Sequence, residues 1–227
     1  MSKIGKRPAG PATEARLAWL DDIEHWWPLA ARVSDRHRLD VDIDTAVTGK
    51  GGTFPTLICG EVVIKLFGHL PFWRRAHAAE LAAMRRVAED PRILAPRLLF
   101  QARLFDNPTT PWPYLVSTRM RGGAWGETAL SQEEKSAIAA QLGQQERFIN
   151  ALSPVADIAT PDTWSAPGLV EAAKQSVLPP HLIAQIDDFV ARVDQGHRVF
   201  LHGNLMFRHV FVEEGGLQAS STGAMRS

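Results

Sequence analysis

The chain has 227 residues, of which 45% are hydrophobic, so it can bury a substantial core in one domain or two small lobes. Its 25 Lys and Arg residues balance 25 Asp and Glu residues, which excludes a strong global field favouring nucleic acid or an anionic membrane as a partner. A single cysteine, Cys59, excludes an internal disulfide. No apolar run approaches the length of a membrane span, and no apolar signal core follows the basic N-terminus, so a cytoplasmic location is expected.

The first half of the chain is predicted to alternate strands with helices. Residues 1–12, rich in Gly, Pro and Lys, are expected to form a flexible arm. A helix is predicted over 13–31, capped by Thr13. The Ala-rich segment 74–89 predicts another helix. Strands are predicted over residues 41–47, 56–59, 62–67, 97–104 and 114–120, with a tight turn at Gly60-Glu61.

The second half is predicted to be mostly helical. Gly122-Gly123 indicates a boundary between an N-terminal lobe, residues 13–121, and a C-terminal lobe, residues 122–227. Ser131-Gln-Glu-Glu is typical of a capping box and opens a helix to about residue 152. A further helix over 179–193 leads into two apolar strand-like runs that flank a short loop. The order predicts a two-lobed α+β fold.

Three features of the first lobe could bind phosphate. The loop Gly49-Lys-Gly-Gly-Thr-Phe-Pro lies between strands, where glycines let backbone N–H groups approach an anion. Taken alone, such a loop is more often an ordinary hairpin turn. Lys65 lies inside an apolar strand and needs a partner there, unless it reaches solvent from an edge. Glu80 shares a helix face with small apolar residues and is the best candidate partner, although a solvated Glu is the common alternative.

The stretch Val199–Val212 contains His202-Gly203-Asn204 and, five residues after Asn204, His209. It resembles the catalytic loop of the aminoglycoside phosphotransferase and choline kinase-like family, usually written His-Gly-Asp with Asn or His five residues later. The resemblance covers about residues 45–217. It implies a protein-kinase-like fold and an ATP- or GTP-dependent, Mg²⁺-assisted transfer of phosphate to a small hydroxylated molecule, conventionally an aminoglycoside.

The resemblance also implies site residues. Gly49, Gly51, Gly52 and Thr53 would cradle phosphate, Lys65 would bind the α- and β-phosphates, and Glu80 would orient Lys65. The backbone near Ser117, Thr118 and Met120 would contact the base. Position 204 with His202 would form the catalytic site, and His209 would be a possible metal ligand. The oligomeric state is not predicted.

Two departures from the family pattern predict impaired activity. Asn204 occupies the place of the catalytic Asp and cannot act as a base. The metal-binding Asp-Trp-Gly-Asp segment is expected after residue 217 but is missing, so the C-terminal lobe is expected to be incomplete. One choice of codons for residues 219–226, when read from the third base of the first codon, spells Val-Val-Asp-Trp-Gly-Asp-Ala. This second reading suggests a frameshift near residue 218. A non-catalytic nucleotide-binding or interaction module and a non-functional frameshifted fragment are the alternatives.

Overall fold

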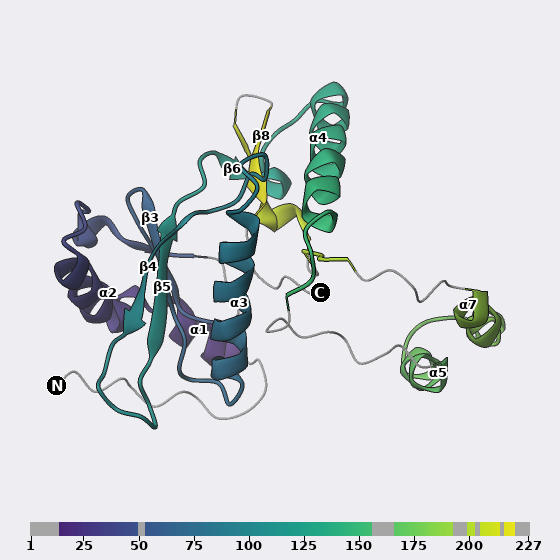
Figure 1. The fold of residues 1–227 in the computed structure, drawn as a ribbon, viewed down its shortest axis with the longest axis horizontal. Coiled ribbons are helices and arrows are strands. Elements are labelled where there is room, and N and C mark those ends of the chain that lie inside the picture. The colour runs from purple at the N-terminus through teal and green to yellow at the C-terminus, as the bar shows by residue number, and fades with distance from the viewer. Residues whose placement is uncertain are drawn as a thin grey trace.

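The computed structural model describes residues 14–49, 53–155, 166–192, 199–202, 205–213 and 216–220. Two antiparallel sheets organise this part of the chain (Figure 1). One has the strand order β1-β2-β3-β5-β4 and the other the order β6-β7-β8. An antiparallel sheet with a covering helix is followed by mainly helical chain, which confirms the predicted α+β class. The predicted arm, residues 1–12, lies outside the described residues.

The strands and helices come in groups along the chain. The strands are β1 (Val47–Thr48), β2 (Thr56–Cys59), β3 (Val62–Leu66), β4 (Leu98–Arg103), β5 (Pro113–Thr118), β6 (Gly123–Ala124), β7 (Val210–Glu213) and β8 (Gly216–Ser220). The α-helices are α1 (Glu14–Asp21), α2 (Ile23–His37), α3 (Trp73–Val87), α4 (Gln132–Asn150), α5 (Ala166–Lys174), α6 (Pro180–Ile183) and α7 (Ile186–Arg192). Short 3-10 helices are η1 (Ile43–Thr45), η2 (Trp125–Glu127) and η3 (Phe207–His209).

The helix predicted over 13–31 is instead two helices that end later, at His37. Asp22 divides them because its side chain accepts a hydrogen bond from the backbone N–H of His25 and so caps α2. Helix α2 then covers one face of the first sheet with Trp26, Leu29 and neighbouring apolar residues. Thr13, the predicted cap, lies outside the described residues.

The prediction of a strand over residues 41–47 was largely wrong. The Asp42 side chain accepts from the backbone N–H of Asp44, and the Thr45 hydroxyl donates to the Asp42 carbonyl at 2.9 Å. These local bonds favour the turn η1 over a strand, because short polar side chains compete with sheet pairing. Only Val47 and Thr48 pair with β2.

Predictions near the C-terminus were also corrected in part. The helix predicted over 179–193 is divided into α6 and α7, which pack with α5. Of the apolar run before His202, only Leu201 forms a bridge, whereas the run after His209 forms β7.

The core of the first sheet was predicted well. The tight turn at Gly60 joins β2 to β3, and Gly60 has a φ of 57°, a value that glycine adopts without steric cost. Strand β3 pairs along its whole length with β5 at the centre of the sheet. Alternate residues of β3 face opposite layers: Ile64 and Leu66 pack under α2, while Phe67, just after the strand, packs on the side of α3.

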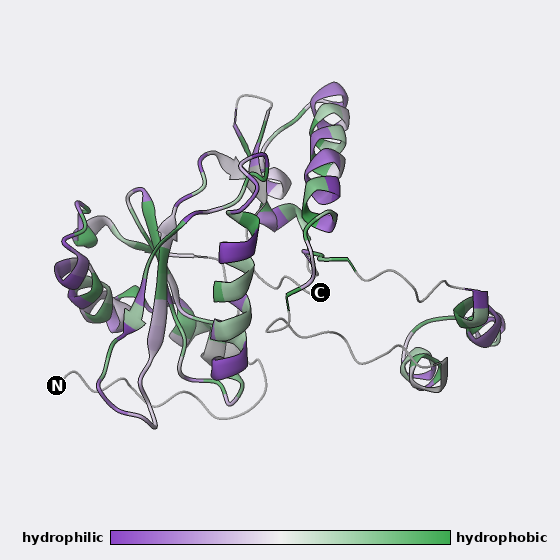
Figure 2. Ribbon diagram, viewed as in Figure 1, coloured by the Kyte–Doolittle hydropathy of each residue, from purple (hydrophilic) through white to green (hydrophobic). Residues whose placement is uncertain are grey.

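The second sheet packs against α4. The predicted capping box is confirmed: Ser131 accepts from the backbone of Glu134, and the Glu134 side chain accepts from the backbone of Ser131. Ile138 of α4 contacts Val210, Val212 and Leu217 in a buried cluster. Figure 2 shows hydrophilic and apolar residues interspersed along α4, as expected for a helix with one buried face.

The chain enters this sheet at Gly122, where a lobe boundary is predicted. Gly122 has a φ of 77°, and a Cβ there would lie 2.1 Å from the carbonyl oxygen of Val212. A glycine is therefore required for β6 to pair closely with β7. Among the helices that the structure describes, none combines the length and apolarity needed to cross a bilayer.

Candidate active site

Lys65 and Glu80 form an ion pair between β3 and α3. The Lys65 Nζ lies 2.6 Å from the Glu80 Oε2, and the two side chains retain 23% and 14% of their accessible surface. Strand β3 lies between β2 and β5, so Lys65 is on a central strand and does not emerge from a sheet edge. The structure thus brings together the two charged residues that the sequence paired.

The sheet and α3 together fix the geometry of this pair. Lys65 extends toward the face that α3 covers, next to a buried cluster that includes Phe67 and Met84. Glu80 reaches the same space because its helix packs on that face through Ala76 and Met84, one turn before and one turn after Glu80. A partly buried ammonium requires an anionic partner, and Glu80 supplies it.

The start of the glycine-containing loop lies beside Lys65. Thr56 pairs with Lys65 across the sheet, and the backbone N–H of Gly49 donates to the carbonyl of Thr56 at 2.7 Å. Thr53 follows the part of the loop that is not described, and Phe54 then packs on Phe67. Gly51 and Gly52 lie outside the described residues.

Most of the backbone donors predicted to contact a base are already engaged. The N–H of Thr118 donates to the carbonyl of Arg97, and its hydroxyl accepts from the N–H of Arg97. The N–H of Arg119 donates to the carbonyl of Glu61. Ser117 is buried within β5, and Met120 lies just beyond the strand, half-buried. For the N–H groups of residues 118 and 119 to contact a nucleotide base, these hydrogen bonds would first have to break.

His202 and His209 lie on either side of the loop that carries position 204. Their ring centroids are 6.0 Å apart, and His202 is buried, with 1% exposure. The 3-10 helix η3 ends at His209, whose backbone N–H donates to the carbonyl of Met206 at 2.7 Å. Gly203 and Asn204 lie outside the described residues, so the position of the Asn204 side chain stays a prediction.

The surroundings of His209 do not fit a Mg²⁺ site. The Arg208 guanidinium donates to the His209 Nε2 at 3.2 Å, placing a positive charge at the atom that would bind a cation. Mg²⁺ also prefers oxygen ligands in octahedral geometry. Within the described ranges, no group of three or more His, Cys, Asp or Glu side chains could hold a metal ion. The metal role expected for His209 is therefore not supported by its neighbours.

Two glutamines of α4 escaped prediction from the sequence. Gln145 is buried, and its side chain bonds the backbone between α3 and β4. Gln141 bonds the backbone of β8. The pattern offered one indication: Gln145 lies on the same stripe of α4 as the buried Ile138 and Ile149, where an apolar residue is expected.

Several solved structures that share this fold are phosphotransferases. The GDP complex of wild-type aminoglycoside 2'-phosphotransferase-IIIa has a TM-score of 0.67 at 12% identity, covering 88% of this chain and 73% of that one. The GDP and kanamycin complex of APH(2'')-IIia has a TM-score of 0.66 at 13% identity, with the same coverages. The macrolide 2'-phosphotransferase MphH from Brachybacterium faecium, an apoenzyme, has a TM-score of 0.63 at 17% identity, covering 89% and 74%. At these identities the likeness shows a shared fold.

Membership of a family rests on the sequence itself. Residues 60–219, well over half of the chain, match the model of the phosphotransferase enzyme family. The matched span runs from the turn before β3 to β8 and so includes Lys65, Glu80 and the loop between His202 and His209. This chain belongs to the phosphotransferase enzyme family.

Proposed function

We propose that this chain binds a nucleoside triphosphate, ATP or GTP, with its phosphates at Lys65. The ion pair between Lys65 and Glu80 carries this proposal, because a lysine held 2.6 Å from a helix carboxylate offers its remaining protons in a fixed direction. The glycine loop that begins at Gly49 would add backbone N–H donors through Gly51, Gly52 and Thr53. The GDP complexes among the structural neighbours support the same choice of ligand.

The proposed reaction is transfer of the γ-phosphoryl group to a hydroxyl of a small molecule. Position 204 would lie at the acceptor hydroxyl, and the buried ring of His202 would support the loop backbone. Kanamycin, an aminoglycoside, is bound in one neighbour, and another neighbour is a macrolide phosphotransferase; both support a hydroxylated small molecule as acceptor. Mg²⁺ is expected from the family resemblance, but the described residues hold no group of three or more His, Cys, Asp or Glu side chains that could bind it.

Turnover is proposed to be slow because of Asn204. A carboxylate at that position can accept or orient the hydroxyl proton, whereas an amide is neutral and cannot act as a base. Positioned bases contribute roughly 10²–10⁴-fold to rate. This residue favours a second candidate function, a nucleotide-binding module that retains Lys65 and Glu80 but transfers little phosphate.

Calorimetric titration with ADP and GDP, together with a phosphate-transfer assay, tests the proposal. We expect micromolar binding to the wild-type chain and a loss of at least tenfold in affinity on Lys65→Ala substitution. Arg121→Ala is the matched control, since Arg121 is a well-exposed cation. Absence of binding, or equal affinity in the Lys65→Ala variant, would refute the nucleotide site. Binding without turnover would favour the second candidate.

A further inference from the structure

The side-chain amide of Gln145 holds the connection between α3 and β4 at two points. Its Oε1 accepts from the backbone N–H of Leu94 at 2.7 Å, and its Nε2 donates to the carbonyl of Arg92 at 3.1 Å. The two partners fix the orientation of the amide, since one is a donor and the other an acceptor. Gln145 is 8% exposed, so water does not readily replace these bonds.

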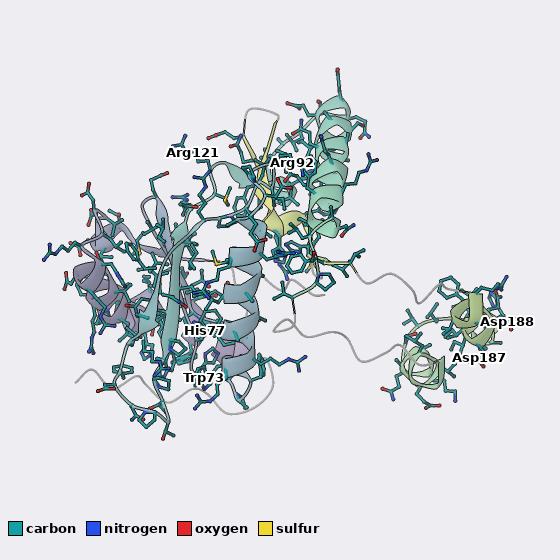
Figure 3. All side chains as sticks on the ribbon, in the orientation of Figure 1. Trp73, His77, Arg92, Arg121, Asp187 and Asp188 are labelled. Carbon is teal, nitrogen blue, oxygen red and sulfur yellow. The ribbon has the colours of Figure 1, made fainter. Side chains whose placement is uncertain are left out.

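Apolar packing fixes the same place. Ile93, between the two bonded residues, lies in a buried cluster with Ala83 and Val87 from α3, Ile149 from α4, and Phe200. Figure 3 shows Arg92 near α4, while Trp73 and His77 mark the far end of α3. The C-terminal end of α3 is therefore anchored to α4, and its N-terminal end is not part of this contact.

Helix α4 also contacts the hairpin that follows His209. Gln141, one turn before Gln145, accepts from the backbone N–H of Leu217 in β8 at 3.0 Å. Residues four apart lie on the same side of a helix. Through these two glutamines, α4 links the end of α3 to the β7–β8 hairpin.

We propose that Gln145 is a positioning residue that keeps Glu80 within reach of Lys65 and couples this pair to the second sheet. Glu80 lies seven residues before the end of α3, or about 10 Å along a rigid helix. A change of about 10° in the tilt of α3 about its anchored end would move Glu80 by about 2 Å. Such a shift breaks the contact with Lys65, because hydrogen bonds are lost beyond about 3.5 Å. This inference rests on the proposed nucleotide site for its effect on binding, but its effect on α3 does not.

Amide hydrogen exchange of a Gln145→Ala variant tests the positioning role. We expect amides at the C-terminal end of α3, residues 83–87, to exchange at least tenfold faster than in the wild type. Amides of α2, which packs on the opposite face of the sheet, should change much less. Gln144→Ala is the matched control, because Gln144 is the exposed neighbour on the same helix and should leave both helices unchanged. Equal acceleration in α2 and α3 would show a general loss of stability and overturn the proposal.

Gln145→Glu supplies a second readout. A protonated carboxyl can accept from Leu94 and donate to Arg92, whereas a carboxylate can only accept and repels the carbonyl. Burial raises the pKa of a glutamate above its ordinary value of about 4.3. Exchange of α3, compared with the wild type at the same pH, should therefore be near normal at pH 4 and accelerated at pH 8. A variant whose α3 behaves the same at both pH values would contradict the two-point clamp.

ADP affinity separates this inference from the proposed function. Gln145→Ala should raise the Kd for ADP about tenfold, and Gln144→Ala should not change it. If Lys65→Ala abolishes binding while Gln145→Ala leaves the Kd unchanged, the coupling is refuted and the nucleotide site stands. If the wild-type chain binds no ADP, the proposed function fails, and hydrogen exchange alone decides whether Gln145 positions α3.

Discussion

Replacing Lys65 by Met and Glu80 by Gln, singly and together, measures how strongly the two side chains interact. The double-mutant cycle subtracts the separate effects of each substitution on the free energy of unfolding. Lys65→Met should be the more costly single change, because it leaves a carboxylate with 14% exposure without its cation. Glu80→Gln keeps an oxygen that can accept from the ammonium.

The structure sets the expected size of the interaction. Exposed ion pairs contribute about 0.2–1 kcal/mol, whereas breaking a fully buried pair costs about 3–5 kcal/mol. With exposures of 23% and 14%, this pair lies between those limits, and we expect a coupling energy of about 1–3 kcal/mol. In a chain of this length, each 1 kcal/mol corresponds to about 2–4 °C in Tm.

Urea unfolding followed by tryptophan fluorescence provides the measurement, since Trp26 and Trp112 are buried in the core of the first sheet. Independent sites add within about 0.5 kcal/mol. A coupling energy below that value would refute the ion pair as a structural element, and with it the reason for placing phosphate at Lys65. The exposed pair of Lys174 with Glu171 is a suitable reference cycle, for which we expect less than about 1 kcal/mol.

Four further predictions concern catalysis, pH dependence and packing. If position 204 needs a general base, Asn204→Asp should raise the rate of phosphate transfer by about 10²–10⁴-fold in a coupled kinase assay. An unchanged rate would show that the absence of a base at position 204 does not limit turnover. Burial lowers the pKa of His77 below its ordinary value of 6.5, so the folded state binds fewer protons than the unfolded state and loses stability as the pH falls below about 6.5. The loss of stability between pH 7 and 5 should therefore be smaller in the His77→Gln variant. Burial raises the pKa of Glu146 above 4.5, and its Oε1 has no hydrogen-bond partner among the described residues. Because the buried charge destabilises the folded state, Glu146→Gln should increase the free energy of unfolding at pH 8. This gain should disappear toward pH 4.5. Trp26→Ala should lower the free energy of unfolding by about 3–5 kcal/mol in urea titrations, and a cost below about 1 kcal/mol would contradict the packing of α2 on the sheet.

Local patterns in the sequence determined the central part of the fold. The apolar alternation of β3, the turn at Gly60 and the capping box at Ser131 each depend on residues a few positions apart, which is why the strands and helices that they predict are present. The family could also be identified from the sequence, because His202-Gly203-Asn204 and the fifteen-residue spacing of Lys65 and Glu80 are linear features. Local competition explains the errors: Asp22 divides a predicted helix, and Asp42 replaces a predicted strand with a turn.

The tertiary structure decided which of the open alternatives hold. Lys65 meets a carboxylate instead of solvent because its strand is central in the sheet. The order of strands in a sheet cannot be predicted from local sequence. The engagement of the Thr118 backbone and the cation beside His209 follow from how neighbouring segments meet in space. Gln145 shows the same limit most clearly. Its partners lie 51 and 53 residues away, so its burial and its two backbone bonds arise only when α4 packs against the end of α3.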